Sequence, residues 1–397
     1  MRSCLPLALL AAVACSSSSG PGAKPTAIRI APFDTTVAIR TTVQYRAALL
    51  DSAGDTIPGL PVTWESSDTT VATITSSGRA TSKARPFGTF IYARYDTALW
   101  TGTSLVVLDS ILVARTKLPN RAYAAAISSS NVAYVSQSDL ARIVRANLPA
   151  KTFGTGVTVG DTPTEIAFNS TGTRAYVTNQ YGSTVSIVDA ATDAQIDLIP
   201  VGSRPFEVIV APGDSILYVA KVDSVYGIRL ATKEIIVRFA IPEVGNGVAI
   251  SRDTLLYIST HNAGTVIEFN LRTRSLGRTF AVGGVPQKLA VSPNGTELYI
   301  ANEAGYVQFW NLTSGLQIGS NLVLPSAAYG LARRPTNGLL YVTSAYFGGG
   351  YIYIINPSTR TLVYSAIVGG STRHVVFNAD GSVGIVPNEG GWVDFLR

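Results

Sequence analysis

Four ionisable residues stand at one equivalent position of a repeated sequence pattern: Glu165, Glu207, Lys288 and His374. If equivalent positions of the repeat surround one axis, two carboxylates, an ammonium and an imidazole converge on a common site. Neighbouring carboxylates could raise each other's pKa, which suits general acid–base catalysis or the capture of a cation, and His374 could carry a proton. The simpler interpretation is that mixed charges lining a solvated channel only pair with one another.

The residues that precede this position in each repeat add aromatic and amide groups, which could stack on a planar or sugar-like ligand: Tyr123, Thr164, Phe206, Asn246, Gln287, Tyr329 and Arg373. The candidate ligand-binding set therefore comprises Glu165, Glu207, Asn246, Lys288, Tyr329, Arg373 and His374. We predict no catalytic residue, because the sequence has no recognisable catalytic motif. With two histidines, and with both cysteines near the amino terminus, we expect no zinc or copper site and no other cofactor.

The repeat itself is marked by a tyrosine that recurs at intervals of about 42 residues, at Tyr134, Tyr176, Tyr218, Tyr257, Tyr299 and Tyr341. Each unit has the pattern of four short strands, which in the second unit are 165–168, 174–178, 184–188 and 196–201. Between the third and fourth strands, four residues are predicted to accept hydrogen bonds from turn amides: Asp189, Asn270, Asn311 and Asn356. Seven such units predict a seven-bladed β-propeller whose first strands line a central channel.

The amino-acid sequence of the repeat resembles that of a known family. The phrase Ala175-Tyr176-Val177-Thr178-Asn179, together with its recurrences, resembles the YVTN repeat family of seven-bladed propellers. Similar propellers include enzymes of lactonase or lyase type that hold a metal in the channel, where only Glu165, Glu207 and Asn246 could contribute here. Some related YVTN proteins are thought to bind single-stranded nucleic acid.

We expect the propeller to span 109–397 and to be closed by its first residues. The seventh unit provides only three strands before the chain ends, and 109–118 has the pattern of a fourth strand. If 109–118 completes the last blade, no blade is left with an open sheet edge.

The segment 25–108 alternates β-rich runs with turn residues, which predicts a β-sandwich. The stretch Val62-Thr63-Trp64-Glu65-Ser66-Ser67-Asp68, followed by Val71-Ala72-Thr73-Ile74 and Gly78, resembles the bacterial Ig-like group 2 domain. Such domains serve mostly as spacers in surface proteins. A tryptophan within an alternating strand is expected in the core rather than in a sugar-binding platform.

The amino terminus has the features of an export signal. Residues 1–14 combine a basic start with an apolar run of about ten residues, which is too short to span a bilayer. The run ends in Ala12-Val13-Ala14-Cys15, which resembles the bacterial lipobox and implies lipidation of Cys15. Residues 15–24 are rich in serine and glycine and are expected to form a flexible tether. By resemblance to Gram-negative lipoproteins, Ser16 after the cysteine is compatible with sorting to the outer membrane.

The net charge of +6 is modest and scattered along the chain, so it does not indicate a dedicated nucleic-acid surface. We therefore expect an all-β, exported, monomeric lipoprotein of the cell envelope, anchored through Cys15 in the outer membrane. Its propeller would bind a protein or glycan ligand without catalysis, and the Ig-like domain would act as a spacer. Two alternatives stay open: an enzyme of lactonase or lyase type that uses the channel mouth, and a protein that binds single-stranded nucleic acid.

Overall fold

The computed structural model describes residues 23–84, 86, 88–251, 254–345 and 350–397, and the chain divides into two compact units, 1–110 and 111–397. Both units are built from β-strands, and one short 3-10 helix, η1 (Ser138–Leu140), lies in the larger unit. The predicted signal 1–14, Cys15 and the tether up to residue 22 lie outside the described residues. No helix in the described part of the chain is both long enough and apolar enough to cross a membrane.

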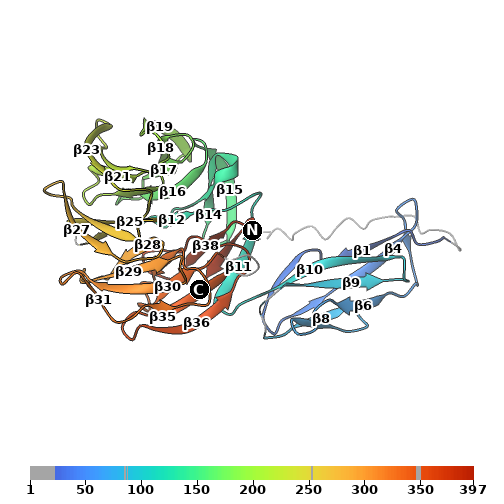
Figure 1. Cartoon of the computed structure of the whole chain (residues 1–397). Helices are drawn as coiled ribbons and strands as arrows, with labels where there is room; N and C mark the ends of the chain where they lie inside the picture. Colours follow the sequence, from blue (N-terminus) through green and yellow to red (C-terminus); the bar gives the residue numbers. More distant parts are fainter. Residues whose placement is uncertain (1–22, 85, 87, 252–253, 346–349) are drawn as a thin grey trace, which may run out of the picture. The chain divides into compact units, whose positions relative to one another are not determined.

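The larger unit contains seven antiparallel sheets arranged as the blades of a propeller (Figure 1). The first six sheets are each made from strands that follow one another in the chain. The first three are β12 (Ala125–Ile127), β13 (Ala133–Gln137), β14 (Arg142–Asn147) and β15 (Thr152–Thr158); β16 (Pro163–Phe168), β17 (Arg174–Asn179), β18 (Thr184–Asp189) and β19 (Ala194–Pro200); β20 (Glu207–Val210), β21 (Ile216–Ala220), β22 (Ser224–Arg229) and β23 (Glu234–Ala240).

The next three sheets continue this order. They are β24 (Gly245–Ser251), β25 (Leu255–Thr260), β26 (Thr265–Asn270) and β27 (Ser275–Ala281); β28 (Pro286–Val291), β29 (Glu297–Asn302), β30 (Tyr306–Asn311) and an outer strand in two parts, β31 (Leu316–Gln317) and β32 (Leu322–Val323); β33 (Leu331–Arg333), β34 (Leu340–Thr343), β35 (Tyr351–Asn356) and β36 (Thr361–Ile367). The seven-bladed propeller fold predicted from the repeat is thus the fold of this unit.

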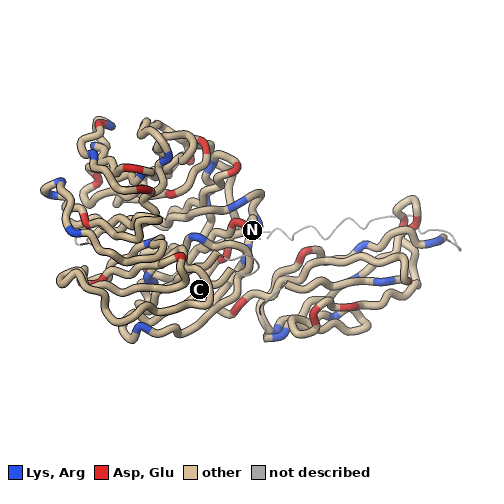
Figure 2. Tube along the Cα trace, viewed as in Figure 1, with Lys and Arg blue, Asp and Glu red and all other residues tan. Residues whose placement is uncertain are grey.

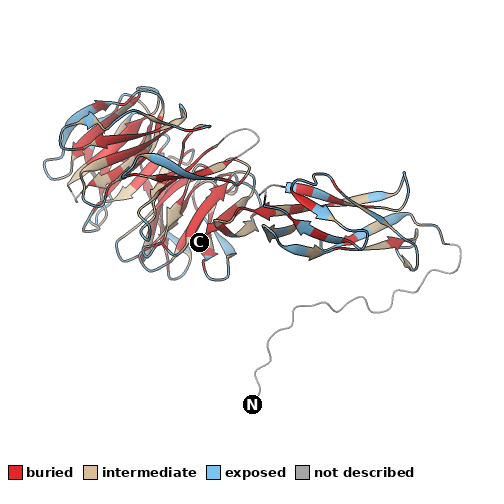
Figure 3. Ribbon diagram, turned by 90° about the horizontal axis from the view of Figure 1, so that it is seen from below, coloured by how far each residue is buried: buried red, intermediate tan, exposed pale blue. Residues whose placement is uncertain are grey.

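The recurring tyrosine explains the period, because its ring packs between blades. All six repeat tyrosines are buried. Tyr134 belongs to a core with Ile166 and Val177 of the second blade, and Tyr257 to one with Leu298 of the fifth blade. One large ring per unit therefore fills the gap to the following blade, and Figure 3 shows that the buried residues gather in the middle strands.

The predicted turn acceptors are confirmed by the hydrogen bonds of the third and fourth strands. In Asp189 and Asn311 the Oδ1 atom accepts hydrogen bonds from the two amides that lie two and three residues further on, at 2.8–3.0 Å. Asn270 and Asn356 make the same pair of contacts. These side chains therefore stabilise the outer turns of the blades.

The last blade joins the two ends of the propeller chain. Its strands are β37 (Val376–Phe377), β38 (Gly384–Asn388), β39 (Trp392–Leu396) and, at the outer edge, β11 (Leu112–Lys117), which precedes the first blade in the sequence. Arg115 of β11 donates to Asp394 of β39 from Nε at 2.7 Å and from Nη2 at 2.8 Å. The guanidinium also lies over the ring of Trp392, 4.6 Å from its centroid.

The charge of Asp394 makes this closing pair important for stability. Its side chain is fully buried, and burial raises the pKa of its carboxyl, while Arg115 and Trp392 lower it. The ion pair and the planar fork of Arg115 compensate the cost of burying the carboxylate.

The smaller unit has three sheets, which pack around one core. The sheets are β1 (Ala27–Ala31), β4 (Arg46–Leu50) and β5 (Thr56–Ile57); β2 (Thr35–Ala38), β10 (Trp100–Leu108), β9 (Gly88–Arg94) and β6 (Thr63–Ser66); β3 (Thr42–Gln44), β8 (Arg79–Ser82) and β7 (Ala72–Ile74). Trp64 packs against this core near Tyr45, as predicted, with 6.2 Å between the ring centroids.

Replacement of Arg115 by methionine tests the closure of the ring. We expect Arg115→Met to lower the free energy of unfolding of the propeller by about 3–5 kcal/mol, because Asp394 stays buried without its partner. The matched control is Arg229→Met, which breaks an exposed pair with Glu234 and should cost less than about 1 kcal/mol. Urea unfolding followed by tryptophan fluorescence measures both, and equal small losses would contradict the role given to Arg115.

Candidate functional site: a charged pocket on the propeller axis

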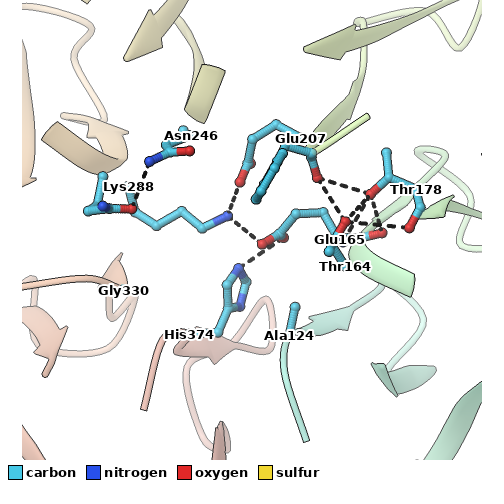
Figure 4. Close-up of polar contacts among 12 residues, drawn as sticks. Ala124, Thr164, Glu165, Thr178, Glu207, Asn246, Lys288, Gly330 and His374 are labelled. Carbon is cyan, nitrogen blue, oxygen red and sulfur yellow. Dashed lines mark hydrogen bonds and ion pairs between the residues drawn. The ribbon is translucent and has the colours of Figure 1, made fainter. Parts of the chain in front are cut away.

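The predicted site residues line one cavity of about 440 Å³ on the propeller axis. Glu165, Glu207, Lys288 and His374 form its floor, which we call the ion cluster (Figure 4). The other predicted residues lie nearer the mouth: Asn246, Tyr329 and Arg373. The seven candidates from the repeat are thus brought together, whereas Cys15 lies outside the described residues.

Lys288 connects the two carboxylates of the ion cluster. Its Nζ lies 2.5 Å from Oε1 of Glu165 and donates a second hydrogen bond to Oε1 of Glu207. Nε2 of His374 lies 3.1 Å from the other oxygen of Glu165. The two glutamates are only 7% and 5% exposed, so these charges meet below the mouth rather than in the open channel entrance that the sequence suggests.

The two glutamates have opposite pKa shifts. Burial acts to raise the pKa of Glu165, but His374 and Lys288 outweigh it and bring the pKa to about 2. Burial and the charge of Glu165 raise the pKa of Glu207 to about 8, against the influence of Lys288. The prediction that the carboxylates raise each other's pKa is therefore wrong for Glu165, because its partners are two nitrogen groups rather than one carboxylate. Burial and the neighbouring charge of Glu165 thus favour the protonated form of the Glu207 carboxyl.

The ion cluster has room because small residues stand at the equivalent position of the other three blades: Ala124, Gly247 and Gly330. A Cβ on Gly247 would lie 2.2 Å from the backbone oxygen of Gln287, and one on Gly330 would lie 2.8 Å from that of Arg373. The next blade passes directly over these glycines. A side chain there would push away the strands that carry Lys288 and His374.

Hydroxyl groups on the second strands of the blades connect the first strands of neighbouring blades. Thr178 Oγ1 accepts a hydrogen bond from the amide of Glu165 and donates to the carbonyl of Phe206 in the next blade, both at 3.0 Å. Ser136 makes the same link between Ala124 and Thr164. These hydroxyls occupy the fourth position of the recurring phrase, a signal that the sequence analysis did not use.

A second network surrounds the mouth. Gln287 donates from Nε2 to Glu303 at 2.7 Å, and the hydroxyl of Tyr329 donates to the other oxygen of Glu303 at 2.7 Å. Burial and Glu303 together raise the pKa of Tyr329 to about 12, so its hydroxyl stays a donor. Asn246 joins this network through a 3.2 Å hydrogen bond to Gln287.

The network continues on the far side of Tyr329. Its ring lies under the guanidinium of Arg373, 4.7 Å from the centroid. Arg373 donates from Nε to Glu389, and Arg121 donates to the second oxygen of Glu389 at 2.6 Å.

Several residues of the mouth were missed at the sequence level: Arg121, Arg204, Glu303 and Glu389. The two glutamates directly follow the asparagine that ends the recurring phrase, Asn302 and Asn388. That asparagine fixes the turn, since Asn302 accepts from the amides of Val285 and Ala304. Comparing the residue after each phrase would have found Glu303 and Glu389. Comparing the residue two positions before Tyr123 and before Phe206 would have found Arg121 and Arg204.

The described residues contain no group of three or more histidine, cysteine, aspartate or glutamate side chains placed to hold a metal. Within the ion cluster, the ammonium of Lys288 takes the position between the carboxylates where a cation would bind. Asn246, the third member of the considered metal set, bonds to Gln287 instead. The arrangement is thus internally neutralised by a lysine.

Comparisons with known proteins give information on the fold. No family model matches the sequence, and no curated protein matches it. Among many similar solved structures is a chain of Kuenenia stuttgartiensis hydrazine synthase, with a TM-score of 0.63 and 17% identity. The likeness covers 72% of this chain and 97% of that one. At this level of identity it supports a propeller-like all-β fold.

The pKa shift of Glu207 predicts a pH dependence of stability. Its pKa of about 8 in the folded state exceeds the usual value of 4.5, so its contribution is full below about pH 4.5 and is lost as the pH rises towards 8. We expect wild-type stability to fall over this range by roughly 1.4 kcal/mol per pH unit at most. Glu207→Gln, which keeps an acceptor for Lys288, should flatten this decline.

Urea unfolding at several pH values between 5 and 8.5 measures the effect. Glu234→Gln changes an exposed glutamate and should leave the wild-type slope in place. Parallel curves for wild type and Glu207→Gln would show that the proton is held elsewhere.

Proposed function

We propose that the protein is an exported, lipid-anchored binding module of the cell envelope, whose propeller holds a ligand in the axial cavity. On this proposal residues 1–14 are the signal, Cys15 carries the lipid, and the smaller unit is an Ig-like spacer. The larger unit would be a propeller of the YVTN repeat type. The anchor and the spacer are supported by the sequence features described above, and the binding role rests on the cavity.

The observation that carries the binding role is the pairing of the buried charges. Glu165 is engaged by Lys288 and His374, so neither of its oxygens is free to attack a substrate or remove its proton. The mouth, in contrast, presents side chains held in place by neighbours, among them Gln287, Tyr329 and Arg373. Preorganised polar groups around a cavity of this volume suit recognition of a small molecule or of one residue of a larger ligand.

A second candidate, an enzyme of lactonase or lyase type, is favoured by Glu207 alone. This residue lines the cavity and its pKa of about 8 suits a general acid or base. Turnover of a lactone panel by the wild type that is lost in Glu207→Gln would favour the enzyme over the binding module.

Nucleic-acid binding has less support. Positions of basic and acidic residues are interspersed along the described part of the tube in Figure 2.

Substitution at the mouth tests the binding role. We expect Tyr329→Ala to weaken binding to envelope glycans on an array at least tenfold, because it removes a ring and the donor to Glu303. The matched control is Tyr364→Ala on the outer strand β36, which should bind as the wild type does. Unchanged binding by Tyr329→Ala, with an unchanged melting temperature, would place the ligand elsewhere.

The anchor is tested separately. In Cys15→Ser we expect the protein to leave the membrane fraction, because stable attachment needs acyl chains that only the cysteine can carry. Cell fractionation and mass spectrometry of the mature amino terminus measure the change. Retention of Cys15→Ser in the membrane fraction would contradict lipid anchoring.

A further inference from the structure

The two sides of the cavity mouth differ in charge. On one side are three arginines. Arg121 lies in the connection from the seventh to the first blade, Arg204 directly precedes the third blade, and Arg373 directly precedes the first strand of the seventh. On the other side are amides and a carboxylate from the fourth and fifth blades: Asn246, Gln287 and Glu303. An entering ligand therefore meets cations on one side and hydrogen-bond acceptors on the other.

The arginine side keeps positive charge that the protein does not neutralise. Glu389 pairs with both Arg121 and Arg373, and Arg121 also lies 3.9 Å from Asp139. With Arg204, three guanidiniums therefore meet two carboxylates. Each guanidinium has five N–H donors, and these contacts use only a fraction of them. Among the described residues Arg204 forms no ion pair, and its guanidinium lies over the ring of Tyr181, 5.8 Å from the centroid.

The opposite side favours hydroxyl groups. Glu303 accepts one hydrogen bond on each oxygen from neutral donors, Gln287 and Tyr329, which leaves lone pairs for further donors. Because no cation of the described residues pairs with Glu303, a second anion placed beside it would be repelled. The anionic end of a ligand is therefore directed towards the arginines.

Aromatic groups and the floor complete the site. Tyr123 and Phe206 also line the cavity, each two residues after one of the arginines, and offer apolar surface to a ring. On the floor, Lys288 lies between Glu165 and Glu207, so the carboxylates do not present uncompensated charge to the cavity.

We infer that the cavity binds a hydroxylated ring bearing one anionic group, such as a sugar acid. The anion lies among Arg121, Arg204 and Arg373, and the hydroxyls bond to Glu303 and its neighbouring amides. This inference rests on the proposed binding function and names its ligand class. A carboxylate and a phosphate fit the arginines by the same chemistry, so a uronate and a phosphorylated sugar are the two sources to be compared.

Calorimetric titration of the full chain with three probes tests the inference: galacturonate, galactose 6-phosphate and galactose. We expect one or both acids to bind at least roughly tenfold more tightly than galactose, which is the effect of one charge-assisted contact. Added salt should weaken the binding of the acids and leave the affinity for galactose unchanged. The tighter acid identifies the source of the anionic group.

Arginine variants make the test specific. In Arg204→Gln, which removes an exposed side chain without an ion pair, the acids should bind roughly tenfold more weakly while galactose is unaffected. Arg272→Gln, at an exposed turn between β26 and β27, is the matched control and should retain wild-type affinity.

Equal affinity for galactose and the acids, failure of both acids to bind, or identical affinities in Arg204→Gln would each overturn the inference. If Tyr329→Ala nevertheless abolishes glycan binding, the binding function stands and only the anionic ligand class falls. If Tyr329→Ala also binds normally, the proposed function falls as well.

Discussion

Side chains from seven innermost strands compete for the space around one axis, and any charge placed there loses most of its contact with water. Four long residues fit because the other equivalent positions are Ala124, Gly247 and Gly330, and at the two glycines the next blade leaves no room for a Cβ atom. Buried carboxylates are tolerated only with a partner. Lys288 satisfies this requirement for both Glu165 and Glu207 and thereby forms a closed floor to the cavity.

The recurring phrase serves the scaffold rather than the ligand. Its tyrosine packs against the next blade, its hydroxyl residue connects neighbouring first strands, and its asparagine fixes the turn before the following strand. The residues that make this cavity distinct stand beside the phrase, at Glu165, Lys288 and Glu303. A similar fold in another protein thus carries no information about the ligand, because the shared residues are those that hold the blades together.

Closure of the ring supports the site from outside. Arg115 and Asp394 are separated by 279 positions in the sequence, yet their ion pair joins the edge strand to the last blade. The blade closed in this way carries His374 at the axis and Arg373 and Glu389 at the mouth. Loosening the pair would therefore affect both the floor and the arginine side of the cavity.

The sequence by itself determined the period, the seven units, the turn acceptors and the membership of the ring that contains Glu165, Glu207, Lys288 and His374. These features repeat, and a repeat reports which positions are equivalent in space. Only the tertiary structure decided which members touch, because contacts across the axis depend on side-chain length and on the depth of each strand. Lys288 reaches Glu165 over 123 positions, and His374 together with Lys288 reverses the expected pKa shift of Glu165. Arg121 and Arg204 stand at an equivalent repeat position, two residues before Tyr123 and Phe206, but only the packing of whole blades showed that they line the same cavity as Arg373.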